Sequence, residues 1–554
     1  MYTISDYLLD VLYYLNVKDI LGVPGDYNLS FLDHITKRND MKWRGNSNEL
    51  NAAYMADGYA RQNGFAAFVT TFGVGELSAI NGITGSKVER VPVLEIVGSP
   101  STQVQNNHKL MHHSLGDGTF NHFRKVHQDL GIKTGYLTKD NAVSTINDVI
   151  KYVIDNKRPA YLNFPSNLAD MPLNPIFKKI IPQLFEDKSN SSNQVDNQTV
   201  INEIKNAKSP IIIVGEDIER FGLSSEVKKL IIDNQIPFAD LIESKGTIDE
   251  SLDQFIGTYN GKLSSPETNK LIENADLVLL LGTVIFDTNI GGFDQIFNNQ
   301  NTIDINSSRI DFYSEIFTYY HENSFIKVIK EISKLKLENV NHKKIKFINK
   351  ISQINSKDQL LTQNFYINAM QDFIKSGDTV VVDQGTSTFG LSLVKLPADV
   401  TFICQPSWSS IGYSFPATLG SELAAPKRRT VLSVGEGSLL LTIQEMAFAI
   451  KNNLKPIIFI LDNRGYTVER VIHGMTEPYN DVPQLDYAVI PQAFGASKDQ
   501  YEYFDVKTEN ELVAAMKKIN LSEEKLTIVR VCLAKDDAPS NLKQLGETLS
   551  QQNK

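Results

Sequence analysis

Short apolar runs separated by segments of helix length are the feature that most limits how this chain can fold. In the first third of the sequence, the runs lie at residues 20–23, 66–70, 91–97 and 159–164. Runs of about four to eight apolar residues bounded by turn residues are typical of strands buried in a parallel sheet, and the intervening segments suit crossover helices. The alternation predicts an α/β fold with doubly wound parallel sheets.

The same alternation recurs twice along the chain, which predicts three domains in series. The further runs lie at residues 210–215, 275–282, 301–305, 379–382, 401–403, 431–434 and 456–461. A Ser/Asn-rich stretch at residues 187–198 can bury little apolar surface and is typical of a linker, and a Lys-rich stretch at 334–357 interrupts the pattern again. Because 554 residues suffice for three or four domains, we predict domains at 1–180, 195–340 and 358–554.

Composition excludes several classes of binding partner for this chain. There are 55 basic and 65 acidic residues, and the net charge of −10 repels nucleic acid and anionic lipid surfaces. No apolar run reaches the roughly 18 residues that span a bilayer. No basic residue precedes Lys18 as in a secretory signal, and Cys404 and Cys532 are too few for a disulfide framework. We therefore expect a soluble, cytoplasmic protein that binds neither nucleic acid nor membranes.

Two glycine-containing loops follow neighbouring strands in the third predicted domain. They read VGEGS at residues 434–438 and LDNRG at 461–465, and Asn463 lies 27 positions after Glu436. A crossover helix at about residues 442–452 and one strand fill this interval, so both loops are expected at the carboxyl edge of the sheet, where doubly wound folds bind ligands. Glu436 and Asn463 can share a cation there, and the glycines let backbone N–H groups approach a phosphate.

A glycine pair after a strand is weak evidence when taken alone, because an ordinary tight turn has the same sequence. The second loop places further polar residues at the same edge of the sheet and thereby favours a metal–diphosphate site. The residues alone leave both interpretations open.

These loops and several other segments resemble the thiamine diphosphate-dependent 2-oxo acid decarboxylases, a family that includes pyruvate, indolepyruvate and branched-chain 2-oxo acid decarboxylases. The family signature is Gly-Asp-Gly followed, one strand later, by Asn-Asn, and this chain has Gly-Glu-Gly and Asp-Asn in register. Other matching segments are VPGDYN at 23–28, NELNAAYMADGYAR at 48–61, TTFGVGELSAING at 70–82, MHHSLGDG at 111–118, DQGTSTFG at 383–390, SIGYSFPATLG at 410–420 and GYTVERVIHG at 465–474. The likeness is weaker in the middle domain, where no Gly-x-Gly-x-x-Gly supports a flavin or nicotinamide role.

The resemblance implies non-oxidative decarboxylation of a 2-oxo acid. In the family, a carbanion of the cofactor adds to the keto carbon, carbon dioxide leaves while the electrons of the broken bond move into the thiazolium, and the resulting enamine is protonated before the aldehyde is released. Glu49 is implied as the carboxyl group on the pyrimidine ring of the cofactor, and such acid–base catalysis contributes roughly 10²–10⁴ in rate. The other implied catalytic residues are Asp26, His112, His113 and Glu469.

Taken alone, the implied carboxylates have plainer interpretations. Glu49 is typical of a helix start, Asp26 of a turn residue that caps a helix, and Glu469 of a solvated helix residue. Only the match to the family motifs favours catalytic roles for them.

The histidines also have alternatives. His108 and His112 have the spacing of two zinc ligands on one helical face, but Lys109 stands where a zinc protease has glutamate and no cysteine is near, so we expect no zinc. Neighbouring histidines are more often surface residues than catalysts. Their match to the His-His pair of the family makes His112 and His113 candidates for proton transfer.

The resemblance also implies the binding residues. Those for thiamine diphosphate are Glu49, Thr71, Thr386, Ser409, Ile411, Gly435, Gly437, Ser438, Asn463, Gly465, Tyr466, Thr467 and Val468. Those for Mg²⁺ or another divalent cation are Glu436, Asn463 and Gly465. Those of the substrate pocket are Gln384, Thr388, Phe389, Ile472, Leu545 and Leu549. The last two are expected on a carboxyl-terminal helix that closes over the site, although they could simply pack a tail helix.

A roomy pocket is expected, because Thr388 stands where some relatives have an aromatic residue. Aromatic 2-oxo acids such as indolepyruvate or phenylpyruvate, or branched ones, should then react at least as well as pyruvate. The family further implies a homodimer at minimum and often a homotetramer, because the first domain of one subunit and the third domain of its partner hold opposite ends of the cofactor. The alternatives are a carboligating synthase, or a cofactor-binding paralogue with weak or no catalysis.

Four residues depart from the family pattern near the cofactor. They are Ser409 for glycine, Glu436 for aspartate, Asp462 for asparagine and Arg464 for aspartate. Because glutamate is longer by one methylene, we expect weaker or less selective binding of the divalent cation. We expect Arg464 to offset the charge of Asp462, and Ser409 to contact the cofactor through its carbonyl if the chain keeps its path.

Overall fold

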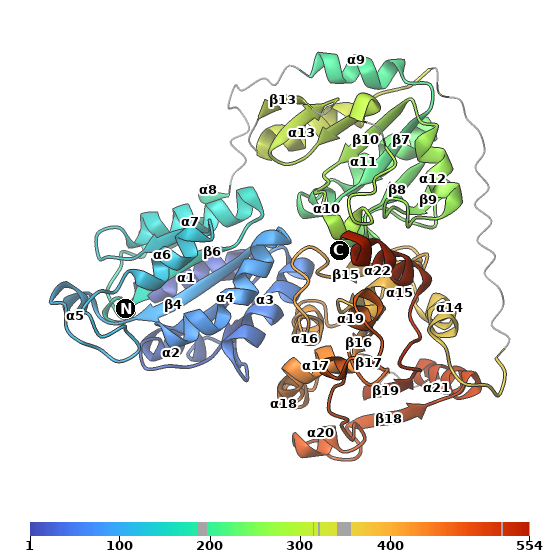
Figure 1. Ribbon diagram of the computed structural model, residues 1–554. Coiled ribbons are helices and arrows are strands. Elements are labelled where there is room, and N and C mark those ends of the chain that lie inside the picture. Colours follow the sequence, from blue (N-terminus) through green and yellow to red (C-terminus); the bar gives the residue numbers. More distant parts are fainter. Residues whose placement is uncertain are drawn as a thin grey trace. The chain divides into compact units, whose positions relative to one another are not determined.

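The chain forms three α/β sheets in series, which confirms the predicted fold class (Figure 1). The computed structural model describes residues 1–185, 197–297, 299–313, 315–319, 322–338, 340, 356–521 and 525–552. Most of the predicted linker at 187–198 and most of the Lys-rich stretch beyond residue 340 lie outside the described residues. The domain limits remain predictions.

The first sheet has six parallel strands in the order β2-β1-β3-β4-β6-β5. The strands are β1 (Asp19–Gly22), β2 (Lys42–Gly45), β3 (Ala66–Thr71), β4 (Val93–Ser99), β5 (Lys133–Tyr136) and β6 (Ala160–Pro165). The helices are α1 (Ile4–Tyr14), α2 (Leu29–Thr36), α3 (Glu49–Asn63), α4 (Val74–Val88), α5 (Thr102–Asn106), α6 (His122–Asp129), α7 (Ala142–Asn156) and α8 (Ile176–Leu184). The strand order reverses at β1 and β3, which makes their carboxyl ends a switch point.

Helices cover both faces of the first sheet. On one face, α1, α2 and α7 share an apolar core with alternate strand residues such as Leu94 and Ile96. On the other face, where Glu95 and Tyr161 point, α4 and α6 contribute hydrogen-bond partners. The alternation follows from the pleat of the strands, since successive side chains point to opposite faces.

The middle sheet has seven strands in the order β13-β12-β11-β10-β7-β8-β9. The strands are β7 (Pro210–Val214), β8 (Phe238–Asp240), β9 (Phe255–Thr258), β10 (Leu277–Leu281), β11 (Thr302–Ile305), β12 (Arg309–Phe312) and β13 (Glu315–Tyr319). The helices are α9 (Gln198–Asn206), α10 (Glu216–Arg220), α11 (Ser224–Asn234), α12 (Pro266–Glu273) and α13 (Glu322–Ile332). β12 and β13 add an antiparallel edge to the parallel strands, because the few residues between β11 and β12 cannot form the crossover that a parallel strand needs.

The third sheet has six parallel strands in the order β15-β14-β16-β17-β19-β18. The strands are β14 (Thr379–Val382), β15 (Thr401–Ile403), β16 (Thr430–Gly435), β17 (Ile457–Asp462), β18 (Tyr501–Val506) and β19 (Leu526–Cys532). The helices are α14 (Gln363–Phe373), α15 (Thr386–Leu391), α16 (Ser414–Ala424), α17 (Glu436–Thr442), α18 (Met446–Lys451), α19 (Thr467–Ile472), α20 (Ile490–Ala493), α21 (Glu509–Leu521) and α22 (Ser540–Gln552).

The predicted helix at residues 442–452 begins in the wrong place. In the structure α17 starts at Glu436, directly after β16, and a short 3₁₀ turn at Ile443–Glu445 separates it from α18. Glycine is a poor helix former, so the sequence predicted a loop at Gly437. A Cβ atom at Gly437 would lie 2.6 Å from the ring of Tyr466, so a tertiary contact requires glycine inside this helix.

Two compact units make up the chain. The first unit comprises Met1–Ser189, Tyr413–Lys427 and Thr442–Leu454, and the second unit comprises Asn190–Gly412, Arg428–Leu441 and Lys455–Lys554. The middle and third sheets both belong to the second unit. In the described part of the chain, no helix has the length and apolar character needed to cross a membrane.

Candidate active site

A cavity of about 500 Å³ lies in the second unit at the carboxyl ends of four adjacent strands, β15, β14, β16 and β17. Its lining consists of Gln384, Gly385, Thr386, Ser387, Ser409, Ile411, Gly435, Glu436, Gly437, Ser438, Asn463, Gly465, Tyr466, Thr467, Val468 and Glu469. All second-unit residues predicted to bind the cofactor or cation are among them. Gly385 and Ser387 were missed, although a glycine three residues after the end of β14 was a usable signal.

Two glycines shape the part of the cavity that could take a diphosphate. At Gly435, a Cβ atom would meet nothing within 4 Å. At Gly437, the missing side chain leaves room for Tyr466. Backbone N–H groups that no side chain covers, beside an open cavity, can closely approach phosphate oxygens.

Glu436 and Asn463 form the part that could take a cation. The Glu436 side chain is buried, and its Oε1 accepts a hydrogen bond from the backbone N–H of Gly465. Burial, and secondly the charge of Asp462, raise the pKa of the Glu436 carboxyl to about 7. The Oδ1 of Asn463 is buried and accepts no hydrogen bond from the described residues. A carboxylate beside an amide oxygen without a donor fits a divalent cation with oxygen ligands.

Arg530, rather than Arg464, offsets the charge of Asp462. Its Nε and Nη2 lie 2.7 and 2.6 Å from Oδ2 of the buried Asp462. Arg464 is exposed and gives Asp462 only a backbone N–H, at 3.3 Å from Oδ1. The expectation for Arg464 is therefore wrong, because β19 lies beside β17 and brings Arg530 closer than the sequence neighbour.

Arg470 holds the loop after β17 and was not predicted from the sequence. Its guanidinium is buried and donates to the backbone carbonyls of Asn463, at 3.1 Å, and Arg464, at 2.7 Å. It also pairs with Asp481 at 2.7 Å. A Cβ atom at Gly465 would lie 2.3 Å from its Nη2. One buried cation thus fixes the backbone of the segment that could bind a metal.

Ser409 lies in the cavity wall with a φ of +57°, in the left-handed region. Glycine adopts this conformation without strain, which explains why the family has glycine here. The Ser409 hydroxyl donates to the carbonyl of Pro406 at 2.6 Å. The contact of the Ser409 carbonyl with the cofactor stays a prediction.

Gln384 and Thr388 differ in their surroundings. Gln384 lines the cavity, and its Oε1 is buried and receives no hydrogen bond from the described residues. Thr388 is buried, and its hydroxyl donates to the carbonyl of Asp383 at 2.6 Å. Of these two residues, only Gln384 therefore offers the cavity a polar group.

Three apolar residues predicted for the pocket, Phe389, Ile472 and Leu545, are not among the residues that line this cavity. Phe389 and Leu545 pack together in a buried cluster, and Val468 links that cluster to the cavity. Ile472 is half-buried on α19 and is not among the lining residues. The side chain of Leu549 lies outside the described residues.

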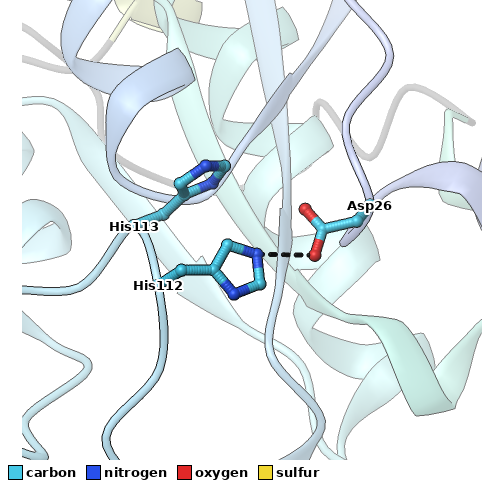
Figure 2. Close-up of side chains that lie close together, drawn as sticks. All are labelled: Asp26, His112 and His113. Atoms are coloured by element: carbon cyan, nitrogen blue, oxygen red, sulfur yellow. Dashed lines mark hydrogen bonds and ion pairs between the residues drawn. The ribbon is translucent and has the colours of Figure 1, made fainter.

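Asp26, His112 and His113 gather in the first unit, after β1 and β4 (Figure 2). The Nε2 of His112 lies 2.8 Å from Oδ2 of Asp26, and both side chains are about half exposed. Tyr27 stacks on His112 with ring centroids 5.0 Å apart, and its hydroxyl lies 3.2 Å from Nδ1. His113 meets His112 edge-on at 4.6 Å. The arrangement can pass protons between solvent and a buried substrate.

The same three residues could in principle hold a metal ion, since their ligand atoms lie within 4.8 Å of one another. However, both ring nitrogens of His112 already have hydrogen-bond partners, Nε2 in Asp26 and Nδ1 in the Tyr27 hydroxyl. The zinc spacing of His108 and His112 does not apply, because both lie in an irregular loop and His108 Nδ1 lies 2.9 Å from the carbonyl of Gly118. Proton transfer is the simpler assignment.

Glu49 and Thr71 lie together in the first unit. Glu49 is the first residue of α3, and Asn48 caps that helix by accepting from the N–H of Asn51. A Cβ atom at Gly75 would lie 3.1 Å from Oε1 of Glu49 and 3.2 Å from Cγ2 of Thr71. Burial raises the pKa of Glu49, and the charge of Glu95 adds to the rise. The Thr71 hydroxyl is buried without a partner among the described residues, so a ligand with polar ring atoms would fit here.

Family models match all three parts of the chain. The N-terminal TPP binding domain of thiamine pyrophosphate enzymes matches residues 2–119, the central domain matches 198–318, and the C-terminal TPP binding domain matches 383–531. The chain is 38% identical over 551 residues to a pyruvate decarboxylase of Kluyveromyces marxianus, covering 98% of this chain and 97% of the relative. It is 36% identical over 546 residues to an alpha-keto-acid decarboxylase of Mycolicibacterium paratuberculosis, covering 98% and 96%.

A solved structure has the same fold. It is a thiamine diphosphate-dependent 4-hydroxybenzoylformate decarboxylase of Rhodococcus jostii RHA1, with a TM-score of 0.77 and 16% sequence identity. The match covers 97% of this chain and 100% of that chain. At this identity the likeness shows the fold alone.

Proposed function

The chain belongs to the thiamine diphosphate-dependent 2-oxo acid decarboxylase family, and on that premise we propose that it converts a 2-oxo acid to an aldehyde and carbon dioxide. One observation carries this proposal furthest: the pair of His112 and Asp26 at 2.8 Å, with His113 beside it. Release of an aldehyde requires a proton at the former carboxyl-bearing carbon, and this cluster can deliver it.

The second unit would hold the diphosphate and its cation. Gly435 and Gly437 would face the phosphates, and Glu436, Asn463 and the carbonyl of Gly465 would bind Mg²⁺ or another divalent cation. When bound, thiamine diphosphate supplies the nucleophilic carbon and the electron sink for decarboxylation. The protein would position the cofactor and the substrate, exclude water and supply protons.

The first unit would supply the acid–base groups. Glu49, with its raised pKa, would share a proton with the pyrimidine end of the cofactor, and Thr71 would orient the same ring. Asp26 and His112 are accessible enough to exchange protons with solvent. Glu469, in the lining of the second-unit cavity, is the remaining proposed acid–base residue.

A large 2-oxo acid is the proposed substrate class. Beside the proposed cofactor site, Gln384 would offer the substrate a polar contact and Val468 an apolar one. Because Thr388 stands where some relatives have an aromatic residue, we propose aromatic substrates such as indolepyruvate or phenylpyruvate, or branched-chain substrates, ahead of pyruvate. A homodimer at minimum or a homotetramer, and a cytoplasmic location, remain proposals from the sequence.

Product analysis tests the assignment. Purified protein with thiamine diphosphate and Mg²⁺ should release an aldehyde and carbon dioxide in equal amounts from phenylpyruvate or 4-methyl-2-oxopentanoate. Comparison of kcat/KM with pyruvate tests the substrate class, and a large preference for pyruvate would refute it. Acyloin as the main product would identify a carboligating synthase, and cofactor binding without turnover a non-catalytic paralogue.

A further inference from the structure

A fully buried polar cluster lies on the face of the first sheet that α4 and α6 cover. Glu95 and Tyr161 are register partners on β4 and β6, Glu76 comes from α4 and His127 from α6, and none of the four has exposed surface. The proposed chemistry uses none of them. Buried ionisable groups are costly unless they are fully hydrogen-bonded, so their bonding shows what they hold in place.

Hydrogen bonds link the four residues to the strands. The Tyr161 hydroxyl donates to Oε2 of Glu76 at 3.0 Å and accepts from Nδ2 of Asn163 at 3.1 Å. The Nε2 of His127 lies 3.2 Å from Oε2 of Glu95, whose Oε1 accepts from the Thr70 hydroxyl at 3.0 Å. The rings of His127 and Tyr161 lie 4.4 Å apart. Burial raises the pKa of Glu76 to about 8.

This cluster touches the segment that carries His112 and His113, residues 107–121, which we call the histidine loop. Gly73, the residue before α4, lies against His113 in the middle of the loop. A Cβ atom at Gly73 would be 2.0 Å from the His113 carbonyl oxygen. The Gly73 backbone has a φ of +70°, and its N–H donates to Oε1 of Glu76 at 2.7 Å. Glu76 thus fixes the turn on which His113 rests.

The cluster also anchors both ends of the histidine loop. Before the loop, Nε2 of Gln105 donates to the Ser99 hydroxyl at 3.3 Å, and Ser99 donates to Oδ1 of Asn163 at 2.6 Å. After the loop, Nδ1 of His127 lies 2.8 Å from the carbonyl of Phe123 on α6. The hydrogen bonds form two groups, one around Tyr161 and one around His127, which meet through the rings of these two residues. Together they reach His113 through Gly73 and bond to Gln105 and Phe123, which flank the histidine loop.

We propose that Glu76, Glu95, His127 and Tyr161 are positioning residues that hold His112 and His113 in the geometry for proton transfer. They act through Gly73 and the two loop anchors and do not touch the reacting atoms. The inference rests on the proposed role of the two histidines. A displacement of about 1 Å in a proton-transfer group can cost on the order of 10²-fold in rate, so the cluster should affect turnover more than cofactor binding.

Tyr161→Phe tests this with a matched control. The variant removes one buried hydroxyl, and kcat should fall about tenfold while the Kd of thiamine diphosphate changes less than twofold. Tyr7→Phe removes an equally buried hydroxyl of the same unit, which donates to Asn147 at 2.6 Å, and should leave kcat unchanged. Unchanged kcat in Tyr161→Phe, or an equal loss in Tyr7→Phe, would overturn the proposal. Glu76→Gln, which keeps the shape, replaces Tyr161→Phe if that variant does not fold.

A second measurement is independent of turnover. In cofactor-free protein labelled at histidine Cε1, the NMR signals of His112 and His113 should shift in Tyr161→Phe and stay in place in Tyr7→Phe. Unmoved signals in Tyr161→Phe would overturn the positioning role whatever the kinetics. If the wild type does not decarboxylate 2-oxo acids, the proposed function fails, and the NMR result still decides whether the cluster positions the histidines.

Discussion

The first and third sheets share one topology but differ in the chemistry at their edges. Counted from its own first strand, each sheet runs second, first, third, fourth, sixth, fifth, with all strands parallel. In both sheets the candidate residues lie at the carboxyl ends of the first four strands or in the segments that follow them, with Thr71 as the last residue of β3. The two regions therefore present residues from the same four places on one scaffold.

The residues at those places differ in kind. In the first sheet they titrate: Asp26 follows β1, Glu49 follows β2, and His112 and His113 follow β4. In the third sheet they are mainly glycines, hydroxyls and amides around one buried carboxyl, Glu436. The fold sets the position of a site and the loops set its chemistry, so the first sheet suits mainly proton transfer and the third mainly binding, with Glu469 as the acid–base residue in the third-sheet cavity.

The largest expected effect comes from the first sheet. Glu49→Gln keeps the size of the side chain but removes the proton that we assign to the cofactor ring. We expect kcat to fall by about 10²–10⁴ with little change in the Kd of thiamine diphosphate. Steady-state kinetics at saturating cofactor and a binding titration measure the two effects.

Glu445→Gln provides the control for Glu49. Glu445 is another buried carboxyl of the first unit, which accepts from the N–H of Ser47 at 2.8 Å near the start of α3. Its loss should reduce stability and leave kcat within tenfold of wild type. Near wild-type turnover in Glu49→Gln would contradict the acid–base role that we assign to Glu49.

The next effect comes from the third sheet and should have the opposite signature. Asn463→Ala removes the buried amide oxygen that we assign to the cation, and the Kd of Mg²⁺ should rise by at least about 10–100-fold. Added Mg²⁺ should restore most of kcat. Asn541→Ala is the control, because this buried amide of the same unit donates to Phe389 and is not among the cavity-lining residues. Equal metal affinity in Asn463→Ala and wild type would contradict the assignment.

Metal binding should depend on pH through Glu436. The pKa of this carboxyl is raised from 4.5 to about 7, so the metal-free protein holds a proton there below pH 7. Each divalent cation must displace that proton, and its affinity should fall up to about tenfold per pH unit below 7 and level off above it. A calorimetric titration at several pH values, with Glu436→Gln as the pH-independent reference, measures this. A flat profile in the wild type would exclude Glu436 as a ligand.

Glu436→Asp addresses the length of the same side chain. Shortening the carboxylate by one methylene should tighten Mg²⁺ binding and favour it over larger divalent ions. If the aspartate variant binds no better, the loop at Gly465, whose N–H already bonds to Glu436, has adapted to the longer residue.

The smallest effect is expected at Ser409. Ser409→Gly should relieve the left-handed backbone strain but lose the hydrogen bond to Pro406 and add freedom to the unfolded chain. These terms oppose each other, and the free energy of unfolding should change by less than about 1 kcal/mol, with cofactor affinity unchanged. Chemical denaturation measures the change, and a large loss of affinity would mean that the serine side chain itself binds the cofactor.

The two regions also differ in how much of them could be predicted. Glu436 and Asn463 follow two apolar runs consecutive along the chain, and consecutive parallel strands usually lie side by side, so their proximity followed from the sequence. Asp26 and His112 lie 86 positions apart, and only the family resemblance predicted that they belong to one site.

Supporting residues could not be predicted from either source. The partners of Asp462 and Arg470 are Arg530 and Asp481, and neither pair follows from sequence distance, because the strand register and the fold of the loop decide them. Glu76 lies in the first turn of α4, and its link to Tyr161 depends on how α4 packs on the sheet. Buried polar partners are fixed by tertiary packing, which local sequence patterns do not encode.

The double variant Glu49→Gln, Asn463→Ala tests the division of labour between the two sheets most directly. Its kcat at saturating Mg²⁺ and thiamine diphosphate and its Kd for Mg²⁺ are compared with those of both single variants. We predict that the double variant has the kcat of Glu49→Gln and the Kd for Mg²⁺ of Asn463→Ala, each within about threefold. The reason is that the free-energy effects of changes at independent sites add. If Glu49→Gln weakens metal binding as strongly as Asn463→Ala does, or if the kcat of the double variant falls far below that of Glu49→Gln, the two sheets do not divide proton transfer and binding between them.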